Sequence, residues 1–304
     1  MPKSLKLIYK QKGIALVQVL IISLILTTLG IYISQTTKSQ VKTAFKIKES
    51  FALRLEIETV EARLLQTLLS EQPYTKVKSF NKMVSSWNFY GKPFKYQDTV
   101  SISIQDLSSL VSVNLMDQTI ARSLLNVLKV NDTKSRELVD SLLDWVDADD
   151  SRRINGAESQ YYRSQGMIEP RNGYIQSVAE VAFIKGADAL TPEQWQENFT
   201  VELVNGFNPL NAPRKVLKAV IKADNIVEQI ISLRNDNQLT TLKFYQLTGI
   251  EDDVFVTYAT GNRFLVKLAV NRDNQKMSKQ FVVTLNPRSN LRPIIITDVA
   301  WNIK

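Results

Sequence analysis

The segment from Ile14 to Thr37 constrains this chain most, because it holds 24 consecutive positions without a charged side chain. As an α-helix, a segment of this length rises about 36 Å, which exceeds the roughly 30 Å hydrocarbon core of a bilayer. A cleaved secretory signal would have a shorter apolar region, of about 7–15 residues, followed by a cleavage site of small residues. The sequence therefore predicts a single transmembrane helix over residues 14–37.

The positive charges around this segment do not fix its orientation. Four lysines precede it and four follow it closely, namely Lys3, Lys6, Lys10 and Lys12 on one side and Lys38, Lys42, Lys46 and Lys48 on the other. A charge excess on one side would be needed to predict which side is cytoplasmic. The orientation must therefore be inferred from other features.

The helical pattern continues beyond the predicted membrane span. From Ile47 to Leu69, apolar residues recur at spacings of three and four, with Lys, Glu and Arg between them. This periodicity is typical of an amphipathic helix. Pro73 cannot continue a helix without loss of a backbone hydrogen bond, so we expect the helix to end near Glu71.

The rest of the chain predicts strands at both ends of a helical middle. Apolar and polar residues alternate over 100–104 and 264–270, and two shorter apolar runs lie at 281–285 and 294–296. Between them, 138–146 and 216–221 have apolar faces at helical spacing, and Thr191-Pro192-Glu193-Gln194 reads as a capping box. We expect an α+β fold in which the long N-terminal transmembrane and stalk helix packs on a small antiparallel sheet.

The expected division of the chain follows from these elements. The sheet core would take residues 38–104 and 255–304, and a large helical domain over 105–254 would be inserted between its strands. Within the insertion, the pattern from Val113 to Asp132 is echoed from Phe207 to Asn225, as in paired SAM-like or helix-hairpin-helix units. Such units can bind DNA. Four of the eight net positive charges lie in the first 13 residues, however, so no nucleic acid is expected as a partner.

The composition excludes most catalytic and metal chemistry, because the chain contains no His and no Cys. Imidazole bases, thiolate nucleophiles, His- or Cys-ligated zinc and Cys-ligated iron–sulfur clusters are therefore ruled out. A metal ion in this chain would have to be held by oxygen atoms. A carboxylate-based hydrolase using Asp144 and Asp147 would need a substrate cleft that nothing but the crowding of acids suggests.

An acidic loop around residues 144–158 is the most distinctive part of the sequence. Read as a twelve-residue calcium loop from Asp147, it places Asp149, Ser151, Asn155 and Glu158 at the third, fifth, ninth and twelfth positions. The sixth position is Arg152, where an EF-hand requires Gly. Two interpretations stay open: an irregular calcium site made of oxygen ligands, or a solvated loop in which Arg152 and Arg153 balance the acids.

The N-terminus resembles the class III signal of type IV pilins and pseudopilins. The resemblance rests on the basic run Lys10-Gln11-Lys12-Gly13 followed directly by the apolar helix. It implies cleavage between Gly13 and Ile14 by a prepilin peptidase, removal of a 1–13 leader peptide and N-methylation of Ile14. Most members have Glu as the fifth mature residue, but here it is Gln18. Because Gln18 cannot neutralise the terminal amine of a neighbouring subunit, a terminal position in the fibre is favoured.

The whole chain resembles the type II secretion minor pseudopilin K family, also called general secretion pathway protein K. The resemblance rests on Asp144-Trp145-Val146-Asp147-Ala148-Asp149 with Gly156-Ala157-Glu158 and Tyr161-Tyr162, on Asp106-Leu107 before Val113-Asn114-Leu115, and on residues 207–213. It implies a pseudopilin core interrupted by a helical domain. It also implies bound calcium near the acidic loop, held by Asp147, Asp149, Asn155 and Glu158, with Asp144 and Asp150 as further candidates.

The same resemblance implies a function without catalysis. The protein would cap the tip of the type II secretion pseudopilus and initiate its assembly with the minor pseudopilins I and J, and also H, for protein export across the outer membrane. It would be a single-pass inner-membrane protein with a cytoplasmic N-terminus and a periplasmic C-terminal domain, and not a homo-oligomer. The alternative is a minor pilin of a type IV pilus or of a DNA-uptake system.

Overall fold

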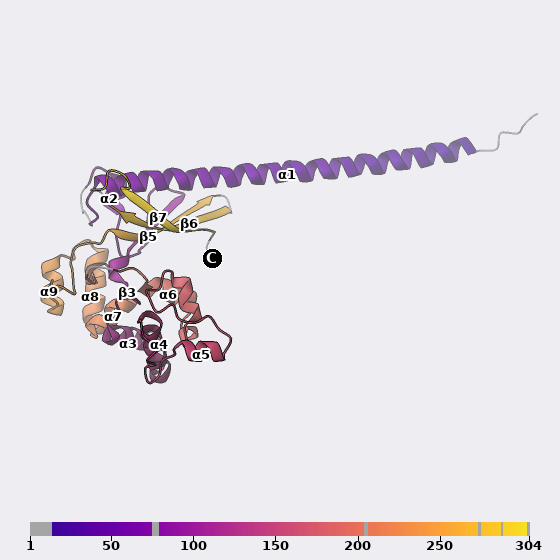
Figure 1. The fold of residues 1–304 in the computed structure, drawn as a ribbon. Helices are drawn as coiled ribbons and strands as arrows, with labels where there is room; N and C mark the ends of the chain where they lie inside the picture. Colours follow the sequence, from indigo (N-terminus) through magenta and orange to yellow (C-terminus); the bar gives the residue numbers. More distant parts are fainter. Residues whose placement is uncertain (1–13, 75–78, 204–205, 273–274, 287, 303–304) are drawn as a thin grey trace, which may run out of the picture. The chain divides into compact units, whose positions relative to one another are not determined.

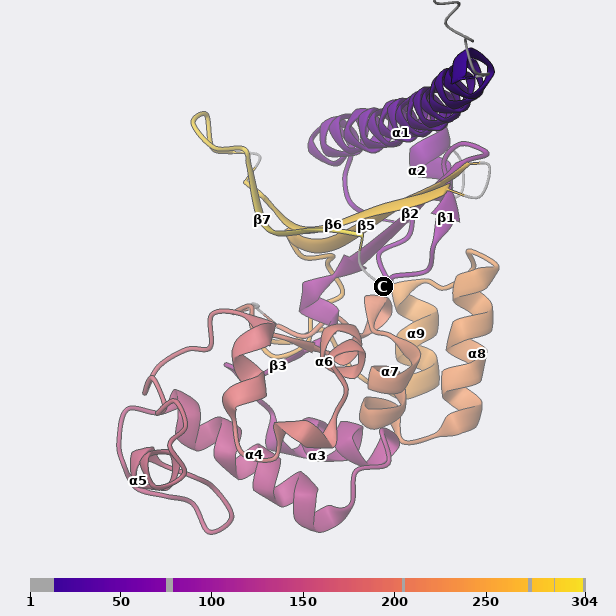
Figure 2. The same ribbon diagram turned by 90° about the vertical axis from the view of Figure 1, so that its right-hand side faces the viewer.

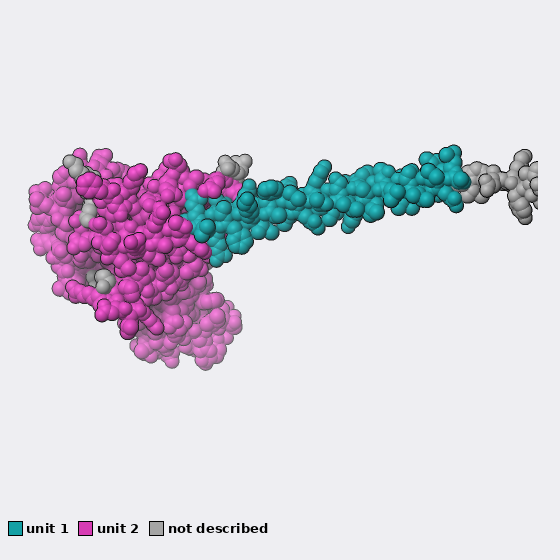
Figure 3. Space-filling view, turned by 90° about the horizontal axis from the view of Figure 1, so that it is seen from above, with its two compact units in different colours: residues 1–56 teal, residues 57–304 magenta. Residues whose placement is uncertain are grey.

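The computed structural model describes residues 14–74, 79–203, 206–272, 275–286 and 288–302. The chain forms two compact units, residues 1–56 and 57–304, which Figure 3 shows in different colours. The boundary falls inside the first helix, α1 (Ile14–Ser70), so the sheet and the helical insertion belong to one unit. The predicted leader and the cleavage site after Gly13 lie outside the described residues.

The described part of the first unit is the stretch of α1 that precedes Ile57. Its apolar side chains, such as Leu16 and Leu24, are exposed, and the helix is long and apolar enough to cross a membrane. The hydroxyls in this stretch bond within the helix, as Thr27 Oγ1 donates to the Ser23 carbonyl at 2.7 Å. Such bonds satisfy polar groups where no water is available. The side chain of Gln18 is exposed on the same stretch.

The second unit contains an antiparallel sheet with the strand order β1-β2-β5-β6-β7. Its strands are β1 (Phe94–Lys95), β2 (Val100–Asp106), β5 (Arg263–Arg272), β6 (Gln275–Leu285) and β7 (Ile294–Trp301). Ile102 of β2 lies opposite Leu268 of β5, and Val266 of β5 lies opposite Phe281 of β6. The predicted strands and their antiparallel arrangement are confirmed.

The end of α1 covers one face of this sheet, as Figure 2 shows. Ile57, Val60 and Leu64 of the helix are buried, and so are alternate residues of β5 and most apolar residues of β2 and β6. Glu61 of α1 forms an ion pair with Lys279 of β6, whose Nζ lies 5.1 Å from the centroid of the Trp301 ring. The amphipathic spacing thus places the helix on the sheet, and α1 ends at Ser70, three residues before Pro73, as predicted.

The other face of the sheet looks toward the helical part of the unit (Figures 1 and 2). Outside the sheet, the helices and short strands are α2 (Lys82–Ser86), η1 (Leu107–Ser109), β3 (Val111–Ser112), α3 (Gln118–Val127), α4 (Asp132–Val146), α5 (Ser159–Ser164), η2 (Val178–Phe183), η3 (Ala187–Ala189), α6 (Pro192–Asn198), β4 (Phe199–Thr200), η4 (Pro209–Asn211), α7 (Arg214–Ile221), α8 (Asp224–Asn235) and α9 (Thr241–Thr248). Strands β3 and β4 pair in parallel. The helices enclose a core of their own that includes Leu138, Trp145 and Leu217. At the start of α6, Thr191 and Gln194 form the predicted capping box.

The sequence repeat corresponds to two helix pairs, α3–α4 and α7–α8. In each pair the turn between the helices contains a lysine with positive φ, 65° at Lys129 and 56° at Lys222. Helix α3 packs on α7, and Ser123 Oγ donates to the Ala219 carbonyl at 2.8 Å. The two copies therefore lie side by side and share the helical core.

A buried carboxylate joins the sheet to the helical insertion. Asp106, at the end of β2, is fully buried. One of its oxygens accepts from the backbone N–H and the hydroxyl of Ser108, and the other accepts from Asn208 Nδ2, Asn211 Nδ2 and the Gly261 N–H. The donors come from η1, from the two ends of η4 and from the segment before β5. Asp106 and the Asn208-Pro209-Leu210-Asn211 run, which carry part of the family resemblance, therefore hold the sheet and the insertion together.

Candidate metal centre

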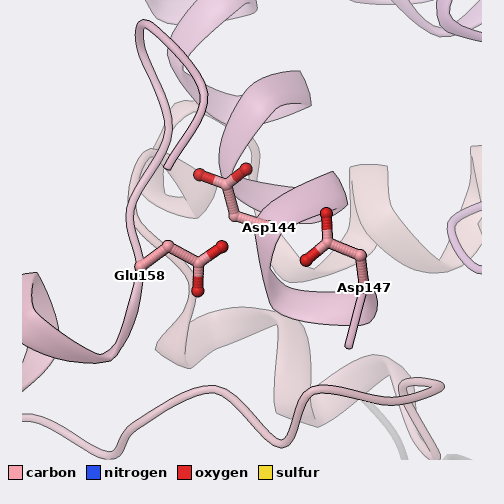
Figure 4. A group of neighbouring side chains, drawn as sticks. All are labelled: Asp144, Asp147 and Glu158. Carbon is pink, nitrogen blue, oxygen red and sulfur yellow. The ribbon is translucent and has the colours of Figure 1, made fainter. Parts of the chain in front are cut away.

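Three carboxylates gather where α4 ends. Asp144 and Asp147 are three residues apart and so share one face of the helix, and Glu158 precedes α5. Each contributes an oxygen atom, and these atoms all lie within 4.8 Å of one another (Figure 4). The C-terminal end of a helix carries partial negative charge, which makes such a cluster of acids unfavourable unless a cation accompanies it.

The loop from residue 147 to 158 is held against α4 by specific contacts. The backbone N–H and the side-chain amide of Asn155 donate to Asp140 Oδ2, at 3.2 and 2.8 Å. Gly156 lies so close to Asp144 that an added Cβ would overlap the carboxylate oxygen Oδ2. Lys185 Nζ donates to the Asn155 carbonyl at 3.2 Å. These contacts bring Glu158 back to the end of α4, opposite the two aspartates.

Arg153 supplies part of the positive charge that the cluster needs. Its Nη1 lies 2.6 Å from Asp144 Oδ1 and 2.5 Å from Asp147 Oδ2, and its backbone N–H also donates to Asp144. The guanidinium thus occupies a cation position between two of the three carboxylates. Arg152, in contrast, is exposed. The balancing of acids by arginine, one of the two interpretations of this loop, therefore falls to Arg153.

Glu158 is left without such compensation. It is 4% exposed, and burial together with the nearby charges of Asp144 and Asp147 raises its pKa to about 7. Both of its carboxylate oxygens, and Oδ1 of Asp147, are buried with no hydrogen-bond partner in the described part of the chain. Buried carboxylate oxygens without a partner are costly, and a bound cation would satisfy them.

The donor set fits calcium, which takes six to eight oxygen ligands in irregular geometries. Asp144, Asp147 and Glu158 could together offer several oxygens to a single ion. In such a site the ion would bind both Glu158 oxygens and Asp147 Oδ1, the carboxylate oxygens that make no bond to Arg153. The chain has neither His nor Cys, so an all-oxygen site also agrees with its composition.

The side chains of the remaining candidate ligands do not point into this group of three carboxylates but make other contacts or are exposed. Asp149 and Asp150 are exposed, and Asp149 Oδ1 accepts from the Ser151 N–H at 2.7 Å, a bond that lowers the pKa of Asp149. The side chain of Asn155 is engaged with Asp140. The structure therefore brings Asp147 and Glu158 together with Asp144. The EF-hand spacing does not include Asp144. Asp144 and Asp147 are three residues apart on a predicted helix, however, and this spacing alone predicts that their side chains are neighbours.

Comparisons with known proteins agree with the resemblance found in the sequence. Residues 103–200 match the family model described as Type II secretion system (T2SS), protein K. The chain is 26% identical over 200 residues to the type II secretion system protein K of Klebsiella pneumoniae, and 25% identical over 197 residues to its counterpart in Escherichia coli strain K12. These alignments cover 60% and 58% of this chain and the same shares of the two relatives.

A solved structure has the same fold. One chain in the crystal structure of the GspK-GspI-GspJ complex from the enterotoxigenic Escherichia coli type 2 secretion system matches with a TM-score of 0.55 at 12% sequence identity. The match covers 87% of this chain and 100% of that chain. The expected α+β pseudopilin fold is thereby confirmed.

Proposed function

We propose that this chain, whose residues 103–200 form a domain of the type II secretion system protein K family, is a minor pseudopilin of such a system. The observation that carries the proposal is the combination of two features in one polypeptide. The apolar helix α1 continues without a break to Ser70, where its C-terminal part packs on the antiparallel sheet, and the match to this family runs from β2 into the helices inserted between β2 and β5. An apolar helix that continues into a folded domain suits a subunit that passes from a membrane into a fibre.

We further propose that the protein caps the tip of the pseudopilus and initiates its assembly. Gln18 supports a terminal position, because it offers no carboxylate to the amine of a neighbouring subunit. The helical insertion adds bulk to the sheet core, which would obstruct a further subunit stacked above it. In this role the protein acts through its shape and its contacts and catalyses no reaction.

The proposed partners are minor pseudopilins of the I, J and H types. The solved structure with the same fold is a complex of GspK with GspI and GspJ, which supports partners of these two kinds. Processing by a prepilin peptidase between Gly13 and Ile14 and insertion in the inner membrane with a periplasmic C-terminal domain complete the proposal.

Deletion of the gene tests the proposed function. We expect loss of secretion of the proteins exported by the type II system, with other membrane functions intact, and rescue by the wild-type gene. Rescue should fail for a variant with Gly13→Asp, which would block removal of the leader. Unaffected secretion of every exported protein, or loss of surface pili or of DNA uptake instead, would contradict the proposal.

Calcium binding at the acidic cluster is a separate part of the proposal. The ion would be held by Asp144, Asp147 and Glu158, and its role would be to fix the loop between α4 and α5. Because a ligand selective for the folded state stabilises that state, calcium should raise the melting temperature of the full chain in detergent above its value with a chelator. Equal melting temperatures would show that Arg153 alone balances the acids.

A further inference from the structure

A cavity of about 260 Å³ lies away from the acidic cluster. Its lining residues are Tyr74, which follows α1, Tyr90, the end of η4, the C-terminal end of α8 and the turn after it, the start of α9, and the segment that leads to β5. Most of the lining residues carry a hydroxyl or an amide group, among them Asn211, Tyr258 and Thr260, although much of the exposed lining is apolar. The charged side chain in its wall is Arg234.

Arg234 is a buried cation without a counter-charge. It is 7% exposed, and no carboxylate of the described residues lies within ion-pair distance of it. Its Nη1 and Nη2 donate to the carbonyls of Ala212 and Pro209 at 2.7 and 2.8 Å, but its Nε is buried without a partner. Burial lowers the pKa of Arg234 to about 10, so the group is still charged at neutral pH. A buried cation that lacks an anion is strongly destabilising, and a bound anion would compensate it.

Two further features of the cavity favour an anion. The N-cap Thr240 and the first residue of α9, Thr241, line it; the Thr240 hydroxyl accepts from the Lys243 N–H, and the other N–H groups of the first turn have no partner within the helix. The Tyr90 ring lies 5.3 Å from the guanidinium carbon of Arg234, and both residues line the cavity, so the unpartnered Nε is the donor of Arg234 that a ligand would satisfy. Arginine, a helix N-terminus and several hydroxyls together are the groups that bind carboxylates and other oxyanions.

The surroundings select among anions. Asp252 and Glu251 lie close enough to Tyr258, a residue of the wall, to raise its pKa together with burial. Their negative charge repels any anion, but it disfavours a ligand with two charges, such as phosphate, more than a singly charged carboxylate. The cavity is also larger than an acetate ion needs, so a residue-sized group would fill it better.

We propose that this cavity binds a carboxylate carried by a polypeptide, either a C-terminal carboxylate or an Asp or Glu side chain, with Arg234 as the compensating cation. The site is distinct from the acidic cluster, since the two share no residue. It would give the second unit a place to hold a chain end or an acidic residue of a protein in the secretion pathway. The proposal does not depend on calcium binding.

Calorimetric titration of the full chain in detergent tests it with four probes: acetyl-Ala-Ala-Ala with a free C-terminus, the same peptide amidated, acetyl-Ala-Glu-Ala amide, and acetate. We expect at least tenfold tighter binding of one carboxylate peptide than of the uncharged amide. Preference for the free C-terminus would identify a chain end, and preference for the Glu peptide would identify a side chain. Acetate binding as tightly as the peptides would overturn the polypeptide source, and binding of the amide as tight as that of the acids, or no binding of any carboxylate, would overturn the site.

A variant that keeps the fold ties the binding to this cavity. Arg234 itself holds two backbone carbonyls, so its replacement could unfold the protein. Asn237→Asp instead adds a negative charge to the wall, at an exposed position with φ of 53° that aspartate also adopts. We expect at least tenfold weaker peptide binding. The matched control, Gln238→Glu, adds the same charge next to the cavity but outside its lining and should change binding less than twofold. Equal effects of the two variants would contradict the assignment.

Discussion

Asp106→Asn is predicted to be among the most destabilising conservative changes in the chain. The carboxylate is fully buried and accepts five hydrogen bonds, two at one oxygen and three at the other. In asparagine, one of these oxygens becomes an NH₂ group that faces two or three donors. Leaving a buried polar group without a partner costs about 1–3 kcal/mol. We therefore expect the free energy of unfolding to fall by about 3–5 kcal/mol, a large part of the roughly 5–15 kcal/mol typical of a domain.

Urea denaturation of the full chain in detergent, followed by the fluorescence of its four tryptophans, measures this loss. Asp117→Asn is the matched control. Asp117 is the exposed N-cap of α3, and asparagine caps helices as well as aspartate does, so the same chemical change should cost less than about 0.5 kcal/mol there. If Asp106→Asn cost less than about 1 kcal/mol, the junction of the sheet and the insertion would not depend on this carboxylate.

Three further predictions concern the acidic cluster and the contact between α1 and the sheet. Glu158→Gln should lower the melting temperature less in chelator than in calcium, because it removes a ligand together with a buried acid; equal losses would speak against the ion. Gly156→Ala should destabilise the chain by about 2 kcal/mol or more in thermal or urea unfolding, since its Cβ overlaps Asp144, whereas Gly173→Ala, which meets no close atom, should change stability by under about 0.5 kcal/mol. Lys279→Met should lower the melting temperature by leaving Glu61 buried and unpaired, and Glu61→Leu added to it should restore most of the loss; no recovery would contradict a simple ion pair.

Local patterns in the sequence predicted the elements of the fold well. Alternation identified β2 and β5, the Thr191 capping box marked the start of α6, and Pro73 placed the end of α1 within a residue of Ser70. These signals depend on neighbouring residues. The partners of Asp106 could not be found in this way, because Asn208 and Gly261 are distant in sequence and reach it only through the tertiary contacts of η4 and the pairing of β2 with β5.

In the acidic loop too, local spacing predicts only some of the residues that come together. The EF-hand spacing predicts Asp147 and Glu158, which lie together, and also Asp149 and Asn155, whose side chains bond to the Ser151 N–H and to Asp140. The difference arises because Asp147 is the C-cap of α4, so a residue one helical turn earlier, Asp144, shares its position in space. The Asp149 side chain instead bonds to the backbone two residues on, as aspartates in turns often do.

Co-purification tests the central claim most directly. The full chain is expressed with the I-type and J-type minor pseudopilins of the same organism, extracted in detergent, and isolated through an affinity tag on this chain alone. We predict a complex that contains one copy of each of the three proteins and survives size-exclusion chromatography. Recovery of the chain alone, or with further copies of itself, would contradict its assignment as a minor pseudopilin at the tip.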